Sequence, residues 1–146
     1  MHKVVPDMQA KIHIPILHIA EATAEKLKEN HIDKVALLGT KYTMLQDFYK
    51  PKLIEVGIDV MIPNDEDIEV VNNVVYNELC LGKILNSSKR EYIRIISELK
   101  EKGAQGVILG CTEIGLLIDQ NDCDIPVFDT TQIHARKAAF LTIEFK

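Results

Sequence analysis

The sequence predicts an α/β domain in which a parallel sheet of about four strands has helices on both faces. Short apolar runs, such as Val35–Leu38 and Val107–Leu109, have the length and composition of strands that are buried on both faces. Helical patterns separate these runs at intervals of about 20–30 residues, which is typical of βα units. A chain of 146 residues with 47% hydrophobic residues is long enough for one domain with its own core.

The first half of the chain alternates helical and strand patterns. Apolar residues at helical spacing predict a helix over residues 1–13, and high helix propensity predicts another over 21–30. Ile14–Ile19 is expected as a short strand, because its Pro15 suits a strand entry. Three further elements follow: a strand at 34–39, a helix capped by Thr43 and interrupted by Pro51, and a strand at 58–62 after Gly57.

The second half begins with three carboxylates, Asp65, Glu66 and Asp67, at the start of a predicted helix. Carboxylates there complement the helix dipole, and the alternative for this acidic cluster is a metal site. Four elements follow: a helix capped by Ser87 or Ser88 and ended by Gly103, strands at 107–109 and 125–129, and a last helix capped by Thr130 and Thr131. The pattern predicts a three-layer, flavodoxin-like domain over 14–130 and a C-terminal helix over 131–146.

Cys111 follows the 107–109 strand in the sequence Gly110-Cys111-Thr112-Glu113. Gly110 suits a sharp turn at the carboxyl end of the strand, and ligands of open α/β sheets bind at that edge. If Thr112 or Glu113 opens a helix, the helix N-terminus lowers the pKa of Cys111 below its ordinary value of about 8.5. The sequence then predicts a thiolate that acts as a base or nucleophile. The alternative is that Cys111 is a small buried hydrophobic residue.

Composition narrows the classes of partner. A net charge of −5 without a basic stripe argues against nucleic acid and against anionic membrane surfaces. No apolar run reaches the length of about 20 residues that spans a bilayer, and we expect a cytoplasmic protein. Three cysteines without a CxxC spacing support neither a disulfide framework nor a zinc site, and the histidines lack ligand-like spacing, so no metal is expected.

Four segments taken together resemble a known family: Gly110–Glu113, Leu38–Met44, Gly103–Leu109 and Pro126–Thr131. Over nearly its whole length the chain resembles the aspartate/glutamate racemase superfamily, the cofactor-independent amino-acid racemases. Glu113 after Cys-Thr is similar to the aspartate or broad aspartate/glutamate branch, because glutamate racemases usually have a histidine at that position.

The resemblance implies racemisation by two cysteines on opposite faces of the substrate, without pyridoxal phosphate or another cofactor. One thiolate removes the Cα proton of the amino acid, and the other cysteine returns a proton. By motif match, Cys111 is the base or acid of one domain, and Glu113 orients or tunes its thiol. The hydroxyls of three threonines, Thr40, Thr43 and Thr112, then hold the substrate carboxylate, and Lys41 neutralises a side-chain carboxylate. Simple helix capping is the alternative for Thr40 and Thr43, and a solvated side chain is the alternative for Lys41.

The chain also departs from the family. Family members are longer and have their first catalytic cysteine in a further domain, so residues 1–13 are expected as the remnant of a missing first domain. The chain is accordingly expected to be a half-enzyme with little activity alone. Cys80 is expected in the core and Cys123 in an exposed loop, neither replacing the second thiol. Apolar residues of the last helix need a partner, and a homodimer is expected.

Two other functions remain open at the level of sequence. The first is a related enzyme of the same superfamily, such as a hydantoin racemase, an arylmalonate decarboxylase or a maleate isomerase. The second is a non-catalytic module or truncated product that binds a carboxylate without turnover.

Overall fold

The computed structural model describes residues 4–144 and contains one parallel sheet of four strands in the order β2-β1-β3-β4. The α/β fold with about four parallel strands is confirmed. In chain order the helices and strands are α1 (Val5–Gln9), α2 (Ile19–Glu29), β1 (Lys34–Leu38), α3 (Lys41–Leu45), α4 (Lys50–Ile54), β2 (Asp59–Met61), α5 (Asp65–Asn77), α6 (Asn86–Glu101), β3 (Val107–Leu109), β4 (Val127–Asp129) and α7 (Thr130–Glu144). Three short 3-10 turns, η2 (Leu79–Leu81), η3 (Ile114–Leu116) and η4 (Gln120–Asp122), lie between them.

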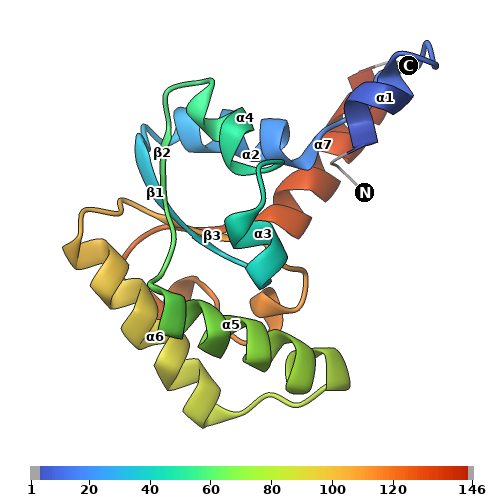
Figure 1. The fold of residues 1–146 in the computed structure, drawn as a ribbon. Coiled ribbons are helices and arrows are strands. Elements are labelled where there is room, and N and C mark those ends of the chain that lie inside the picture. Colours follow the sequence, from blue (N-terminus) through green and yellow to red (C-terminus); the bar gives the residue numbers. More distant parts are fainter. Residues whose placement is uncertain (1–3, 145–146) are drawn as a thin grey trace.

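Helices cover both faces of the sheet, as the sequence predicts. Figure 1 shows α5 and α6 on one side of the strands and α2, α4 and α7 on the other. The core is accordingly split in two. One cluster contains Val71, Tyr92 and Ile95 beneath the α5–α6 face, and the other contains Leu27 and Leu53 beneath the opposite face. Strands β1 and β3 lie between the two clusters and are almost completely buried, which explains why both read as continuous apolar runs.

The expected strand over Ile14–Ile19 is wrong. Within the described chain, this segment pairs with no strand and leads into α2. Pro15 has no N–H to donate, and the Ile16 N–H donates to the side chain of Gln9 instead of to a sheet. His18 ends the segment as the N-cap of α2, because its Nδ1 accepts a hydrogen bond from the Ala20 N–H. The extended segment before His18 therefore leads into the N-terminus of α2 and does not pair with the sheet.

Three expected helix caps differ in detail. Thr40, not Thr43, is the N-cap of α3, and its hydroxyl accepts the Thr43 N–H. Ser88 lies inside α6, where its hydroxyl donates to the Glu78 carboxylate, so neither expected serine caps that helix. At the start of α7 the carboxylate of Asp129 accepts the N–H groups of residues 131 and 132. Each corrected cap lies at a helix start that the sequence located within a few residues.

Glycine and proline positions agree with the sequence reading. Pro51 lies in the first turn of α4, and residues 46–49 separate this helix from α3. Gly57 and Gly103 have positive φ angles of 79° and 102° after α4 and α6, a conformation that L side chains rarely adopt. The helices end at Ile54 and Glu101, three and two residues before these glycines.

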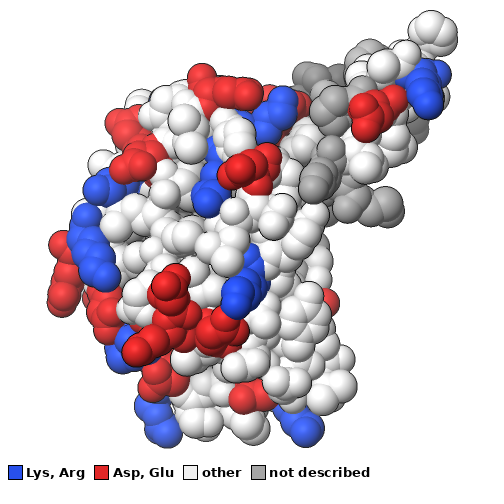
Figure 2. All heavy atoms as spheres, in the orientation of Figure 1, with Lys and Arg blue, Asp and Glu red and all other residues white. Residues whose placement is uncertain are grey.

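The two ends of the described chain form an arm that projects from the sheet domain (Figures 1 and 2). The arm contains α1 and the last turns of α7, with exposed apolar side chains such as Met8 and Phe140. The expected helix over 1–13 is shorter than predicted, because α1 covers only Val5–Gln9. Residues 1–3 and 145–146 of the two expected terminal helices lie outside the described residues.

The visible face of the domain has mixed charge. Figure 2 shows Lys and Arg side chains interspersed with Asp and Glu side chains on this face. No helix among residues 4–144 combines the length and the apolar composition needed to cross a membrane.

Candidate functional site

The candidate residues meet at the carboxyl ends of the two central strands, β1 and β3. Leu38 and Leu109 are register partners there, and each is followed by a glycine. The Gly110 N–H donates to the Leu38 carbonyl at 2.6 Å. The segment after β1, which contains Thr40, therefore starts beside the segment that contains Cys111.

The two glycines allow Thr43 to pack against both strand ends. A Cβ added to Gly39 would lie 3.1 Å from Thr43 Cβ, and one added to Gly110 would lie 3.4 Å from the Thr43 methyl group. The Gly110 Cβ would also lie 3.0 Å from the Leu38 carbonyl oxygen, which is closer than such contacts normally are. Thr43 is thus held next to the peptide that precedes Cys111.

Thr40 and Thr43 form a pair of hydroxyls. Their Oγ1 atoms lie 3.1 Å apart, and the Thr40 Oγ1 also accepts the Thr43 N–H at 3.3 Å. The alternative of helix capping is therefore correct for Thr40, which is the N-cap of α3. Both side chains are half-buried and neighbour each other, which leaves them able to share one oxygen ligand.

Lys41 is held by α5. Its Nζ forms an ion pair with the Glu69 carboxylate, and its backbone N–H donates to Asn72 Oδ1 at 2.9 Å. The sequence reading identified neither partner. Glu69 and Asn72 lie 28 and 31 residues along the chain from Lys41. Their spacing of three residues indicates only that they share one face of a helix, and it does not identify Lys41 as their partner.

Cys111 and Glu113 are in direct contact. The Cys111 Sγ donates to Glu113 Oε2 at 2.9 Å, and the Thr112 hydroxyl donates to the same oxygen at 2.7 Å. Burial of the half-buried thiol, and then the hydrogen bond and negative charge of Glu113, raise the pKa of Cys111 to about 12. The same two hydrogen bonds lower the pKa of Glu113. At neutral pH the pair is therefore a thiol and a carboxylate.

The expectation of a thiolate at Cys111 is wrong for the resting chain. It assumed a helix that opens at Thr112 or Glu113, but only the three-residue turn η3 follows, beginning at Ile114. Such a turn provides little of the dipole that lowers a thiol pKa. Burial and a neighbouring carboxylate both act in the opposite direction. The alternative of a small buried hydrophobic residue is met in part, because Cys111 packs against the core beneath α5 and α6 but is only half-buried.

The other two cysteines differ from their expected environments. Cys80 is exposed on η2 rather than in the core, because α5 ends at Asn77 and the apolar helical face does not continue to it. Cys123 is half-buried against the core rather than exposed. Burial, followed by the charge of Asp122, raises the pKa of Cys123 to about 11.

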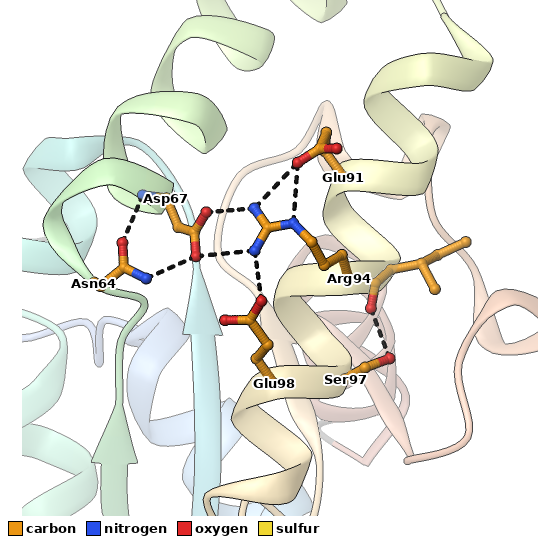
Figure 3. A network of polar contacts seen from close by, with 7 residues as sticks. Asn64, Asp67, Glu91, Arg94, Ser97 and Glu98 are labelled. Atoms are coloured by element: carbon orange, nitrogen blue, oxygen red, sulfur yellow. Dashed lines mark hydrogen bonds and ion pairs between the residues drawn. The ribbon is translucent and has the colours of Figure 1, made fainter.

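One member of the acidic cluster at the start of α5, Asp67, belongs to an ion-pair network (Figure 3). Asp67 is buried and pairs with Arg94 of α6, and the Asn64 side chain both accepts the Asp67 N–H and donates to its carboxylate. Arg94 also contacts Glu91 and Glu98. Among residues 4–144 no three His, Cys, Asp or Glu side chains converge on a possible metal position. Asp67 therefore joins α5 to α6 through Arg94.

A cavity of about 490 Å³ lies along β4 and α7. Its lining includes Gly115 and Asp129, but none of the six candidate site residues.

Comparison with known proteins identifies relatives of the chain. The sequence profile of the Asp/Glu/hydantoin racemase family matches residues 1–138. The crystal structure of a proposed Asp/Glu racemase from Yersinia pestis is 51% identical, with a TM-score of 0.95 over 98% of this chain. That of an aspartate racemase homologue from Pyrococcus horikoshii is 42% identical, with a TM-score of 0.89 over 96% of this chain.

The similarity covers only part of these proteins. The chain spans 63% of the Yersinia protein and 62% of the Pyrococcus protein. The aspartate racemase of Picrophilus torridus is 24% identical, with a TM-score of 0.65 over 82% of this chain and 50% of its own length, and it shares the fold.

Proposed function

The chain belongs to the Asp/Glu/hydantoin racemase family, and from this premise we propose that it supplies one of two proton-transferring thiols for racemisation of aspartate or glutamate. The thiol is Cys111. No cofactor takes part, and Glu113 and the neighbouring hydroxyls provide the polar environment.

The observation that carries the proposal is the 2.9 Å hydrogen bond between Cys111 Sγ and Glu113 Oε2 at the strand ends. It keeps the proton on sulfur, which is the state required of a general acid. In this step the S–H bond breaks, the proton adds to the Cα carbanion, and Cys111 is left as a thiolate. In the reverse direction the same thiolate removes the Cα proton, and its raised pKa makes it a stronger base once it has formed.

The substrate carboxylate binds at the hydroxyls around this thiol. Thr40 and Thr43 lie 3.1 Å apart and each can donate one hydrogen bond to an oxygen anion. Thr112 can turn its hydroxyl from Glu113 to the substrate. Lys41 supplies a positive charge nearby, although Glu69 already pairs with it.

Racemisation requires a second group on the opposite face of Cα. We propose that this group lies outside these 146 residues, since the relatives of known structure extend well beyond the matched part. Cys80 on its exposed turn and Cys123 against the core are not assigned this role. The half-enzyme should then exchange the Cα proton of one enantiomer without inverting it.

The test measures Cα deuterium incorporation into L- and D-aspartate in D2O by NMR, together with chiral chromatography. We expect exchange of a single enantiomer, with a rate that rises between pH 7 and 10 because the thiolate fraction grows tenfold per pH unit below a pKa of about 12. Cys111→Ala should reduce exchange by at least about 100-fold, a typical loss for a general acid or base. Cys80→Ala is the matched control and should leave the rate unchanged.

Two results would contradict the proposal. Equal rates of Cα deuterium exchange in wild type and Cys111→Ala would show that the thiol does not transfer the Cα proton. Efficient formation of the opposite enantiomer by this chain alone would refute the half-enzyme.

The raised pKa of Cys111 favours one second candidate, a module that binds a dicarboxylate without turnover. Such a module would bind L-aspartate in an NMR titration but exchange neither enantiomer at any pH in this range.

A further inference from the structure

The Thr40–Thr43 hydroxyl pair lies on a short element that needs external support. Helix α3 has only five residues, and an isolated helix of that length is unstable in water. On one flank, the Thr43 methyl group packs over Gly39 and Gly110 at the strand ends. The other flank faces α5.

Two side chains of α5 hold the first residue of α3. Asn72 Oδ1 accepts the Lys41 N–H at 2.9 Å, and the Glu69 carboxylate pairs with Lys41 Nζ. Glu69 and Asn72 lie three residues apart and so project from the same face of α5. Both contacts reach the residue that directly follows Thr40.

The part of α5 that provides these contacts is itself fixed. The buried hydroxyl of Tyr92 donates to the carbonyl oxygen of Val71, the neighbour of Asn72, at 3.0 Å. This bond ties α5 to α6 at the level of Asn72. A site is held most accurately when its supporting residues lie on such rigid elements.

We propose that Asn72 is a positioning residue, which together with Glu69 anchors Lys41 and so fixes the Thr40 and Thr43 hydroxyls at the carboxylate subsite. The inference rests on the proposed function for the meaning of that subsite. In addition to its positive charge near the site, Lys41 then serves as the anchor through which α5 holds α3. Asn72 itself does not contact the substrate, and its effect passes through the backbone of residue 41.

The first readout is amide hydrogen exchange at Lys41, measured by NMR on the full chain. Asn72→Ala removes the acceptor and should speed exchange of this N–H by about three- to tenfold, the equivalent of one ordinary hydrogen bond. Asn72→Asp keeps an acceptor oxygen at the same reach and should restore protection. Asn73→Ala changes an exposed asparagine of the same helix and should have no effect.

The second readout is the concentration dependence of Cα deuterium exchange into aspartate. Asn72→Ala should raise KM by about three- to tenfold and leave kcat nearly unchanged, because carboxylate binding is weakened while Cys111 is untouched. If Asn72→Ala does not fold, Asn72→Gln is measured instead. The glutamine side chain is one methylene longer, so its amide oxygen is displaced from the position that accepts the Lys41 N–H.

The outcomes separate the inference from the proposed function. Unchanged Lys41 exchange in the Asn72 variant overturns the anchor whatever the activity. Faster Lys41 exchange with an unchanged KM overturns the positioning role. Absence of Cα exchange in the wild type refutes the proposed function, and the anchor then stands or falls on Lys41 exchange alone.

Discussion

Replacing Glu113 by glutamine tests whether its carboxylate keeps Cys111 protonated. The change removes the negative charge 2.9 Å from the sulfur and preserves the size of the side chain. A glutamine amide can also donate a hydrogen bond to a thiolate, whereas a carboxylate cannot. We therefore expect the pKa of Cys111 to fall from its value of about 12.

The size of the effect follows from the two causes of the raised pKa. Burial, the larger cause, persists in Glu113→Gln, so the pKa of Cys111 stays above its ordinary value. A charge at this distance changes a pKa by about 1–3 units, and partial solvent exposure of the thiol favours the lower end. A fall of about one unit raises the thiolate fraction tenfold at pH 9. A less basic thiolate is intrinsically less reactive by about threefold, which leaves a net acceleration of about threefold.

The assay is alkylation of Cys111 by iodoacetamide between pH 8 and 10.5, followed by peptide mass spectrometry. A Cys80→Ser background removes the exposed thiol, and mass spectrometry separates Cys123. Glu55→Gln is the matched control, because it removes a carboxylate beside α4, on the other face of the sheet.

Two results would refute this reasoning. An alkylation rate that is unchanged or slower in Glu113→Gln would show that the carboxylate does not hold the proton on sulfur. A wild-type profile with its midpoint at or below the ordinary thiol pKa of about 8.5 would show that burial and Glu113 do not raise the pKa of Cys111.

Two further predictions concern stability. Gly110→Ala places a Cβ against the Leu38 carbonyl oxygen and the Thr43 methyl group, and urea unfolding should show a loss of about 1–3 kcal/mol; full stability would contradict the tight packing. Arg94→Ala should cost about 1–3 kcal/mol at pH 7, since buried Asp67 loses its charged partner, while exposed Arg90→Ala should cost little. Arg94 lowers the pKa of Asp67, so this contribution is present above the unfolded value of about 3.9 and is lost as pH falls through the folded value. The urea midpoint of Arg94→Ala should therefore change less between pH 2 and 7 than the midpoint of the wild type. Wild-type and variant midpoints that run parallel with pH would contradict a stabilising Arg94–Asp67 pair.

Much of the fold was predictable because local patterns and long-range packing agree. Strands β1 and β3 are buried on both faces, so their apolar runs identify them without knowledge of their neighbours. Ile14–Ile19 is equally apolar but is not a strand. Its backbone lacks a donor at Pro15, and Gln9, rather than a sheet edge, accepts the Ile16 N–H. Such a competing side-chain contact is not visible in the pattern of apolar residues.

The candidate site was predictable where its residues are close in the chain or end neighbouring strands. Cys111 and Glu113 are two residues apart, and parallel strand order brings Thr40 and Thr43 to the same edge. Asn72 was not found, because its contact with Lys41 depends on how α5 packs beside α3. The apolar periodicity of α5 indicates which face is buried, but it does not indicate which N–H donates to the side-chain oxygen of Asn72.

The amino-acid sequence by itself determined the parallel sheet, the family, and the placement of a thiol, a carboxylate and two hydroxyls at strand ends, because these follow from local pattern and strand order. Only the tertiary structure decided the protonation state of Cys111 and the support of the Thr40 segment. The charge on a thiol depends on how much water packing removes and on which charges packing brings near. Both are properties of segments that meet only after folding.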